Sequence, residues 1–534
     1  MRFSRDKKKE ENRSPLLSAR RYLAFVSTKT KVVFKNYTPN QVMMLPPSLE
    51  ELIDKNHPVR IVNQIIDRIE IDPLLRKFKG GGTSSYHPRM LLKVLVYAYV
   101  NNTYSSRRME AALKENIHFM WLAGMNKPDH NTINRFRSER LKDVLKTVFG
   151  KVVELLVEAG HLDLKEIYTD GTKLEAQANR YTFVWGNAIK HSKASMEQQL
   201  KELWAYAEGV AAEELEDQTP ESFAVVSAEQ VRDTIGKIDR ALEGKEISKQ
   251  KRQKLNYARK NWPANVDRYT AQEQILKKRN SYSKTDTDAT FMRMKEDHMK
   301  NGQLKPAYNV QVSSHNQYVV NYSLHQNPTD TTTLKKHLKS FHDLYKKYPE
   351  VLTADAGYGS EENYLLLNKY KIEGYVKHNQ FDREQHSKNT DWFKGDQLEY
   401  DKKNDVLYCP IGDEMKHIGT STRITANGFK QTLTKYQAKK CNGCALREAC
   451  HSQKGNRIVD INHRLRKLKQ QANARLKSEK GIAYRKRRAA DVEPVFANIK
   501  HNKNFKRFML KGIAKVEIET GLLALAHNLA KVAA

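Results

Sequence analysis

The sequence has few cysteines and no long run of apolar residues. Only four cysteines occur in 534 residues, too few for a disulfide-stapled secreted domain. The first residues are charged and lack the apolar core of a signal peptide. Even the apolar segment 90–100 is interrupted by Lys93 and is too short to span a bilayer. These absences predict a cytoplasmic protein that has no membrane partner.

Negative charge is also scarce in this chain. The 62 acidic residues stand against 94 Lys and Arg, which gives a formal net charge of +32. A protein with this excess repels itself unless a polyanion neutralises it, and nucleic acid is the usual partner. Hydrophobic residues make up 39% of the chain, so a folded protein of several domains is expected. The net charge indicates an affinity for nucleic acid but no catalysed reaction, so a ribosome-associated protein remains an alternative at this point.

The first part of the chain is basic and then becomes helical in pattern. Residues 1–40 are weakly patterned, and we expect a basic, disordered arm there. Residues 41–150 show helical spacing throughout, and Asp129 can cap a short helix whose Arg135 and Arg137 face outward. Several short helices with a basic last one are typical of helix-turn-helix modules, so we predict a helical DNA-binding domain.

Strand patterns begin at residue 163. The order is a strand, a strand pair, a helix, a strand, a helix and a strand, which predicts a mixed α/β fold with an RNase H-like sheet. The predicted sheet is formed by residues 160–187 and 300–380. Residues 188–285 between them have helical spacing and predict an inserted pair of helices.

Acidic residues stand where the catalytic ends of such a sheet are expected. Asp170 and Asp355 lie at or near predicted strand ends, and each precedes a glycine within two residues. An Asp before Gly is most often a turn former, but two of them on different strands of one sheet favour a shared site. The third acid is expected on a helix near the end of the chain, where the sequence offers two carboxylates, Asp491 and Glu493. Glu493 lies seven residues before Lys500, so that one helix places both on one face. Pro494 predicts that this helix restarts or kinks there.

Three carboxylates at one place predict a site for hard divalent cations. Mg²⁺ prefers oxygen ligands and keeps several waters beside one or two protein carboxylates. Two such ions can activate the attacking oxygen and stabilise the leaving oxygen of a phosphodiester. We therefore predict two catalytic Mg²⁺ (or Mn²⁺) ions held by Asp170, Asp355 and Glu493.

All four cysteines fall in one window near the end of the chain. A CxxC pair and two flanking cysteines match the four thiolate ligands of a structural zinc site: Cys409, Cys441, Cys444 and Cys450. The alternative is four reduced thiols without a metal. We predict a zinc ribbon inserted at residues 395–455, with a closed, structural Zn²⁺ site.

The last part of the chain, residues 460–534, is predicted to form basic helices that complete the catalytic core. Eleven residues between 461 and 488 are Lys or Arg, and only Glu479 is acidic. This run includes Arg487 and Arg488, and its position beside the third acid favours phosphate binding over a merely solvated face.

Several long strings of this sequence occur together in one known family. Near the start are LPPSLEELIDKNHPVRIVNQII and SSYHPRMLLKVLVYAYVNNTYSSRRMEAALKENIHFMWLAG. DGTKLEAQANRYTFVW contains Asp170, TADAGYGSEENY contains Asp355, and VEPVFANIKHNKNFKRFMLKG contains Glu493. By these strings the chain, from about residue 34 to its end, resembles the DDE transposases of bacterial insertion sequences.

The resemblance implies a transposase that binds transposon terminal repeats and catalyses DNA cleavage and strand transfer. It also implies double-stranded DNA of the element and of the target as partners, a homodimer assembled on DNA, and a location in the bacterial cytoplasm with the nucleoid. Two alternatives remain open: a catalytically inactive regulator derived from a transposase, and an RNase H-like nuclease without joining activity.

The family often carries a Tyr, Arg, Glu, Lys signature in its last catalytic helix. Tyr484 and Arg487 match the first spacing, and Glu493 and Lys500 match the last one. The spacing from Arg487 to Glu493 is two residues longer than in the family signature. At the spacing that the signature requires after Arg487, this chain has Asp491. The resemblance thus implies DNA-binding roles for Tyr484, Arg487 and Lys500 and leaves Asp491 as the alternative third acid.

Overall fold

The computed structural model describes residues 48–534, apart from 79–84, 216–219, 221, 226, 295–301, 387–391 and 426. The chain divides into two units, Met1–Ser48 and Leu49–Ala534, and every element named below belongs to the second unit. The predicted basic arm, residues 1–40, and the first residues of the predicted DNA-binding domain lie outside the described residues.

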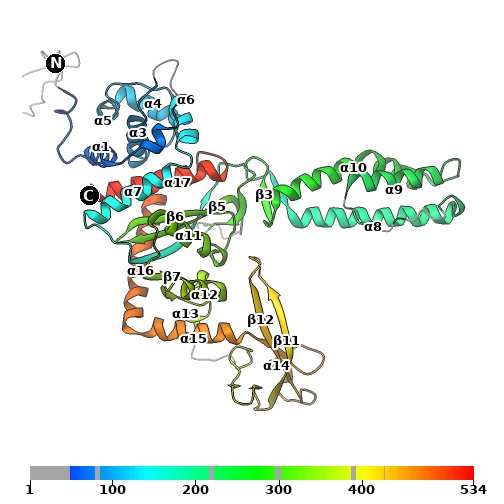
Figure 1. Cartoon of the computed structure of the whole chain (residues 1–534). Coiled ribbons are helices and arrows are strands. Elements are labelled where there is room, and N and C mark those ends of the chain that lie inside the picture. Colours follow the sequence, from blue (N-terminus) through cyan, green and yellow to red (C-terminus); the bar gives the residue numbers. More distant parts are fainter. Residues whose placement is uncertain are drawn as a thin grey trace, which may run out of the picture. The chain divides into compact units, whose positions relative to one another are not determined.

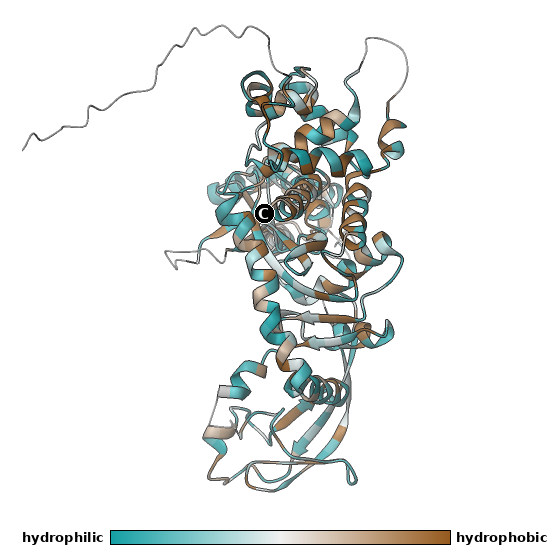
Figure 2. Cartoon of the chain, turned by 90° about the vertical axis from the view of Figure 1, so that its left-hand side faces the viewer, coloured by the Kyte–Doolittle hydropathy of each residue, from teal (hydrophilic) through white to brown (hydrophobic). Residues whose placement is uncertain are grey.

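The N-terminal part of the second unit consists of short helices (Figure 1). They are α1 (Pro58–Arg68), α2 (Asp72–Leu75), α3 (Pro88–Val100), α4 (Ser106–Glu115), α5 (Ile117–Leu122), α6 (His130–Arg135), a π-helical turn (Phe136–Arg140) and α7 (Leu145–Glu158). A proline begins α1 and α3, where no N–H bond is needed, and the preceding His57 and His87 rings accept nearby amide hydrogens. Asp129 accepts the Thr132 amide at 2.8 Å, which confirms the predicted start of α6. These helices carry hydrophobic and hydrophilic residues side by side (Figure 2), as helices that pack on one face do.

A mixed sheet follows, in agreement with the predicted α/β class. Its strand order is β4-β5-β1-β7-β8, and β6 pairs with β5 at residues 309–315, beyond the stretch that pairs with β4. β1 is antiparallel to β5, whereas β7 and β8 run parallel to β1, an order consistent with the predicted RNase H-like sheet. The strands are β1 (Glu166–Glu175), β4 (Thr290–Arg293), β5 (Leu304–His315), β6 (Tyr318–His325), β7 (Val351–Ala354) and β8 (Glu373–Val376). The crossover helices are α11 (Leu334–Tyr345), after a 3₁₀ turn (Asp330–Thr332), and α12 (Glu361–Lys369).

The strands differ from the sequence prediction in one detail. Asp170 was expected near the end of a strand, but it lies in the middle of β1 and pairs with Val312, because Gly171 continues the ladder. The hairpin between β5 and β6 turns at Asn316 and Gln317, whose φ angles of 53° and 65° are left-handed.

Three helices are inserted after β1. They are α8 (Gly186–Val210), α9 (Ala228–Ala241) and α10 (Lys249–Leu276), and the short strands β2 (Phe183–Trp185) and β3 (Ser281–Ser283) pair at their base. The insert has a hydrophobic core of its own, which includes Leu203, Ile235 and Trp262. The sequence prediction of two helices missed α10, because charged residues dilute its apolar face and Pro263 interrupts it.

A second, antiparallel sheet carries the cysteine window. Its order is β13-β12-β11-β10-β9, and Leu407, Met415 and Tyr436 form its buried centre. The elements are β9 (Tyr400–Asp401), β10 (Val406–Tyr408), β11 (Glu414–Ile424), β12 (Lys430–Ala438), α14 (Arg447–Cys450) and β13 (Ile458–Ile461). The short helix α13 (Phe381–His386) precedes this sheet in the chain.

The chain ends in three helices: α15 (His463–Lys477), α16 (Glu479–Ala497), which continues into a π-helical turn (Asn498–Asn502), and α17 (Ile513–Val532). α17 is buried over most of its length, between β6 on one side and α1, α3 and α7 on others. Its Asn528 accepts the Val319 amide and donates to the Val319 carbonyl, both at 2.8 Å, and so satisfies the open side of β6. None of the described helices is both long enough and apolar enough to cross a membrane.

The packing of α17 predicts the effect of one added methyl group. A Cβ atom at Gly521 would lie 2.4 Å from the Tyr322 hydroxyl and 2.9 Å from Leu145 Cδ2, so Gly521→Ala overfills this interface. We expect it to lower the free energy of unfolding by about 1–3 kcal/mol, measured by urea denaturation.

Gly236→Ala is the matched control, because Gly236 also lies within a helix but has no atom within 4 Å of an added Cβ. Better helix propensity is expected to stabilise this variant by about 0.5–1 kcal/mol. Equal effects of the two substitutions would contradict the close contact between α17 and β6.

Candidate active site

Two acids meet on neighbouring parallel strands. Thr169 of β1 pairs with Ala354 of β7, so the next residues, Asp170 and Asp355, lie side by side. Asp170 is buried, with 6% of its surface exposed. Burial, and next the charge of Asp170, raise the pKa of the Asp355 carboxyl above its ordinary value. The two carboxylates therefore form one electrostatic site.

The turn after β7 fixes Asp355. Its Oδ1 accepts the Gly357 amide at 2.9 Å and thereby caps a 3₁₀ turn (Ala356–Tyr358). The buried Tyr358 hydroxyl of this turn donates to Gln311 on β5. The carboxylate of Asp355 is thus held by its own turn, and the turn is anchored to the sheet.

A third acid near this pair, Asp330, was missed by the sequence prediction. Its Oδ1 accepts from Asn309 at 2.8 Å and from Gln311 at 2.7 Å, and its charge also raises the pKa of Asp355. The sequence shows it only as an acid before a predicted helix, a common position for a cap. Its proximity to Asp355 depends on how the strands are paired.

Gly171 makes room for this arrangement. A Cβ atom there would lie 2.3 Å from Gln311 Nε2 and 2.5 Å from Asp330 Oδ1. Glycine after Asp170 therefore does not form a turn. It lets polar side chains from β5 and the Asp330 turn approach the backbone of β1.

One cation compensates the acids. Arg488 of α16 places Nη1 3.2 Å from Asp170 Oδ2, and its side chain is 17% exposed. Its charge counteracts the rise in the pKa of Asp355. Arg488 was predicted to bind DNA, but the structure places it against Asp170.

The two candidates for the third acid have different surroundings on α16. Asp491 is buried and accepts from the Ser314 hydroxyl at 2.6 Å and from the Gln317 amide at 3.2 Å. These contacts give Asp491 a structural role at the β5–β6 hairpin. Glu493 is exposed to solvent. The structure thus brings Asp170 and Asp355 together and leaves Glu493 on the exposed side of the helix.

Pro494 does not end α16, as a restart of the helix would require. The helix continues from Glu479 to Ala497 with Pro494 inside it. A proline cannot donate to the carbonyl four residues earlier, that of Ala490. The side chain of Gln317 donates to this carbonyl at 3.0 Å, so the lost bond is replaced from the hairpin.

The residues predicted to bind DNA are spread over different environments. The Tyr484 hydroxyl donates to Glu166 at 2.6 Å and is buried, whereas Arg487 donates to Asn316 at 2.7 Å and remains 46% exposed. Lys500 is partly buried and Arg135 is exposed.

The prediction that Arg137 faces outward is wrong. Arg137 is 3% exposed and donates to the Tyr104 carbonyl at 2.7 Å and to the Tyr99 hydroxyl at 3.3 Å. Tyr99 in turn donates to the buried Glu519 of α17. The π-helical turn that contains Arg137 shifts the helical register, so spacing alone assigned it to the wrong face.

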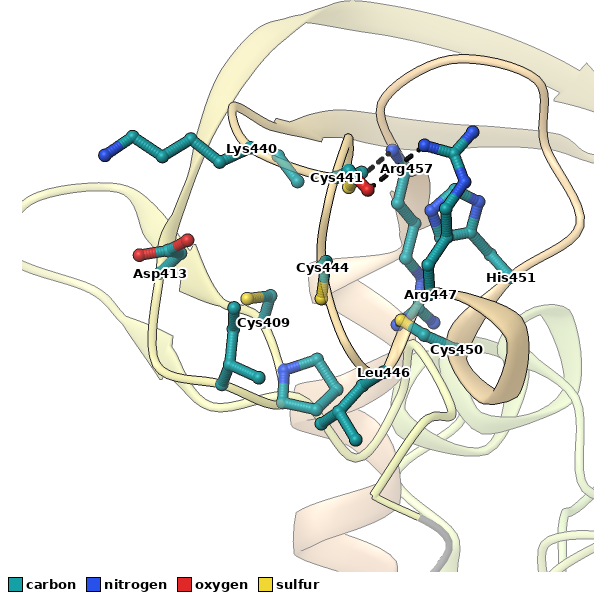
Figure 3. A pocket seen from close by; sticks show the side chains of 13 residues that line it. Cys409, Asp413, Lys440, Cys441, Cys444, Leu446, Arg447, Cys450, His451 and Arg457 are labelled. Carbon is teal, nitrogen blue, oxygen red and sulfur yellow. Dashed lines mark hydrogen bonds between the residues drawn. The ribbon is translucent and has the colours of Figure 1, made fainter.

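The four cysteines surround one pocket in the second sheet (Figure 3). Arg457 also lines this pocket. Its amide donates to Cys441 Sγ at 3.3 Å and its Nη1 to Cys450 Sγ at 3.1 Å. In the described part of the chain, no three His, Cys, Asp or Glu side chains are grouped so that they could hold a metal ion. The predicted zinc ribbon is therefore not shown, although its four ligands lie around a common space.

The electrostatics of the acid pair predict two opposite pKa shifts in the metal-free protein. Asp170→Asn removes one negative charge and lowers the pKa of Asp355, which stays raised because burial remains its largest cause. Arg488→Met removes a positive charge and raises that pKa further. The measurement is a ¹³C NMR titration of labelled Asp carboxyls. Asp343→Asn on the exposed side of α11 is the control, and shifts of the same sign for all three variants would contradict the described geometry.

Comparison with known families gives two matches. Residues 47–139 match a transposase domain (DUF772), and residues 408–533 match a transposase DDE domain. The first range covers α1 to α6 and the second includes Glu493 and the cysteines, while Asp170 and Asp355 lie between them. No curated protein and no solved structure gives a match. The two matched ranges support a DDE-type transposase of the insertion-sequence type.

Proposed function

We propose that this protein binds the terminal repeats of its element and cuts and joins DNA strands at Asp170, Asp355 and Glu493. The observation that carries the proposal is the convergence of Asp170 and Asp355 on adjacent parallel strands of a mixed sheet. The net charge of +32 and the transposase DDE domain match support DNA as the substrate. The strand order supports an RNase H-like catalytic core.

Mg²⁺ or Mn²⁺ fits the donor chemistry of this site. Mg²⁺ takes only one or two protein carboxylates and completes its shell with water and substrate phosphates, so a close pair of acids is a sufficient core. Asp170 and Asp355 would hold the metal, and Glu493 would join them from α16. When bound, two such ions polarise the attacking and the leaving oxygen of an in-line displacement.

The chain itself supplies orientation and charge. Arg488 positions the Oδ2 of Asp170, and the Gly357 amide positions the Oδ1 of Asp355. In the first reaction a water oxygen bonds to phosphorus at the end of the element, and the bond to the 3′ oxygen breaks. The released 3′-hydroxyl then attacks a phosphorus of the target DNA and displaces its 3′ oxygen in the same way. Both reactions are phosphoryl transfers, so one site serves both.

Exposed cations supply the DNA contacts in this proposal. Arg487 of α16 and Arg135 on the N-terminal helices are exposed, and Lys500 follows Glu493 by seven residues. The helical N-terminal part binds double-stranded DNA, and two copies assemble on two element ends. Tyr484 acts through Glu166 as a residue that positions α16, since its hydroxyl is buried.

Substitution of the acids tests the catalytic proposal. Asp355→Asn and Glu493→Gln are each expected to reduce Mg²⁺-dependent cleavage by at least about 100-fold, because even residues that only orient a metal ligand contribute up to this much. The assay incubates protein and Mg²⁺ with linear DNA that carries the terminal repeats, and resolves nicked and joined products on denaturing gels.

Glu479→Gln is the matched control for Glu493→Gln, since both are exposed glutamates of α16. It should leave cleavage unchanged. Wild-type protein that binds this DNA without cutting it would identify a regulator instead of an enzyme, and cutting without joining would identify a nuclease. Full activity of Glu493→Gln would exclude Glu493 as the third acid.

We also propose that the four cysteines hold a structural Zn²⁺. Support comes from their position: every cysteine of the chain lines the same pocket, on three separate segments of the second sheet. Tetrahedral zinc needs four such ligands and leaves no position for a substrate.

Metal analysis tests the zinc proposal. The purified protein is expected to contain about one zinc per chain, and the double variant Cys444→Ser, Cys450→Ser should lose it. The loss should also lower the unfolding midpoint of the second sheet, because metal binding stabilises the folded state. A zinc-free wild type whose four thiols react rapidly with a thiol reagent would refute this part of the proposal.

A further inference from the structure

Three aromatic side chains lie at the surface where the helical insert leaves the first sheet. Tyr181 is 79% exposed and Phe183 is 48% exposed, although aromatic side chains are usually largely buried. Trp185 is partly exposed. Phe183 and Trp185 belong to β2 and share one face of it, because they are two residues apart. We call these three residues the aromatic patch.

The first sheet supports the patch from below. The rings of Phe183 and Trp185 both pack on the buried Phe291 of β4, with centroids 6.0 Å and 5.8 Å from it. Across the ladder of β2 and β3 their partners are Ser283 and Ser281, whose side chains are small and buried. The patch is therefore fixed on its inner side, and its outer side remains accessible.

Positive charge surrounds the patch. Arg180 directly precedes Tyr181 and its side chain is 41% exposed, and Lys284 and Arg293 are exposed at the ends of β3 and β4. The Lys284 amide donates to the Thr182 carbonyl at 2.9 Å, which places this lysine beside the start of β2. Exposed aromatic rings among cations bind single-stranded nucleic acid, because bases stack on the rings and phosphates contact the cations.

The acids of this region do not oppose an anionic ligand. Residues 171–196 and 277–294 contain nine Lys or Arg, and their only acids are Glu175, Asp286 and Asp288. Glu175 is buried and accepts from Arg180 Nε at 3.0 Å. Burial lowers the pKa of Arg279, and the charges of Asp288 and Asp286 counteract this shift, so this cation lies near both acids. Each acid thus has a cation of its own.

The patch is connected to the acid pair through β1. This strand continues from Asp170 to Glu175 beyond the end of β7, and the Ala176 amide then donates to the Pro306 carbonyl of β5 at 2.9 Å. Pro306 pairs with Phe291 of β4, so the ring beneath the patch is level with Ala176. Six residues of extended chain separate this level from Asp170, about 20 Å. At the rise of B-DNA this length corresponds to roughly six nucleotides.

We propose that the aromatic patch binds unpaired bases of the DNA strand that is held at Asp170 and Asp355. This inference rests on the proposed function, because it requires that the protein binds DNA at the acid pair. The bases stack on Tyr181 and Phe183, and the phosphates between them contact the surrounding cations. Stacking tolerates any base, so the patch holds the strand open without selecting its sequence. The residues of the patch are positioning residues and do not touch the reacting phosphorus.

A pair of fluorescein-labelled DNA probes tests the patch. One is a duplex that carries the terminal repeat and continues into eight thymine–adenine pairs. In the other the eight adenines are replaced by thymines, so that these positions stay unpaired while length and charge are the same. We expect the full-length wild type to bind the unpaired probe roughly tenfold more tightly, in line with the stacking energy of one base.

Variants of the patch should change this ratio of dissociation constants. Tyr181→Ala and Phe183→Ala are each expected to reduce it toward one, whereas Tyr181→Phe keeps the ring and should retain it. Tyr257→Ala is the matched control, because Tyr257 is a 58% exposed tyrosine of α10 that does not belong to the patch. It should leave the ratio intact.

The outcomes separate this inference from the proposed function. Circular dichroism melting identifies a Phe183→Ala variant that fails to fold, and the exposed Tyr181 then decides the question. Equal affinity of the wild type for both probes, or an unchanged ratio in Tyr181→Ala, overturns the inference while DNA binding stands. No binding of either probe overturns the proposed function as well.

Discussion

The close approach of two carboxylates, Asp170 and Asp355, is the constraint on which the centre of this protein depends. Like charges on adjacent strands repel, and partial burial increases that cost, as the raised pKa of Asp355 shows. The sheet imposes the approach through the pairing of Thr169 with Ala354. Arg488 and the Gly357 amide offset the charge, so the arrangement is held together by contacts that come from three different segments.

Helix α16 supplies the cation of this compensation, Arg488, and it is joined to the sheet along its length. Tyr484 donates to Glu166 at the start of β1, Arg488 pairs with Asp170, and Asp491 accepts from Ser314 on β5. The hairpin residue Gln317 donates to the Ala490 carbonyl that Pro494 leaves free. A proline inside α16 is therefore compatible with a continuous helix, because the hairpin of the sheet provides the missing donor.

The sequence predicted the fold class and the pairing of Asp170 with Asp355, since alternation and strand order depend on local patterns. It did not predict Asp330, whose importance arises from the pairing of β1 with β5 and from the space beside Gly171. It also misjudged Arg137, because a π-helical turn changes which residues face inward. The choice between Glu493 and Asp491 also depends on more than the local sequence. The string around Glu493 indicates a role for this residue, but the exposure of Glu493 and the burial of Asp491 depend on how α16 packs on the sheet.

One buried acid explains how the cysteine-bearing sheet, inserted late in the chain, keeps its relation to the strands that carry Asp170 and Asp355. Glu361, in the first turn of α12, is 1% exposed and would be costly to bury alone. It accepts from Asn462 at 2.7 Å, from Gln431 at 3.0 Å and from Arg464. These donors belong to β12 and to the start of α15, so one carboxylate joins the second sheet and α15 to the helix that follows Asp355. Because α15 leads directly into α16, the position of Arg488 beside Asp170 depends on this junction as well.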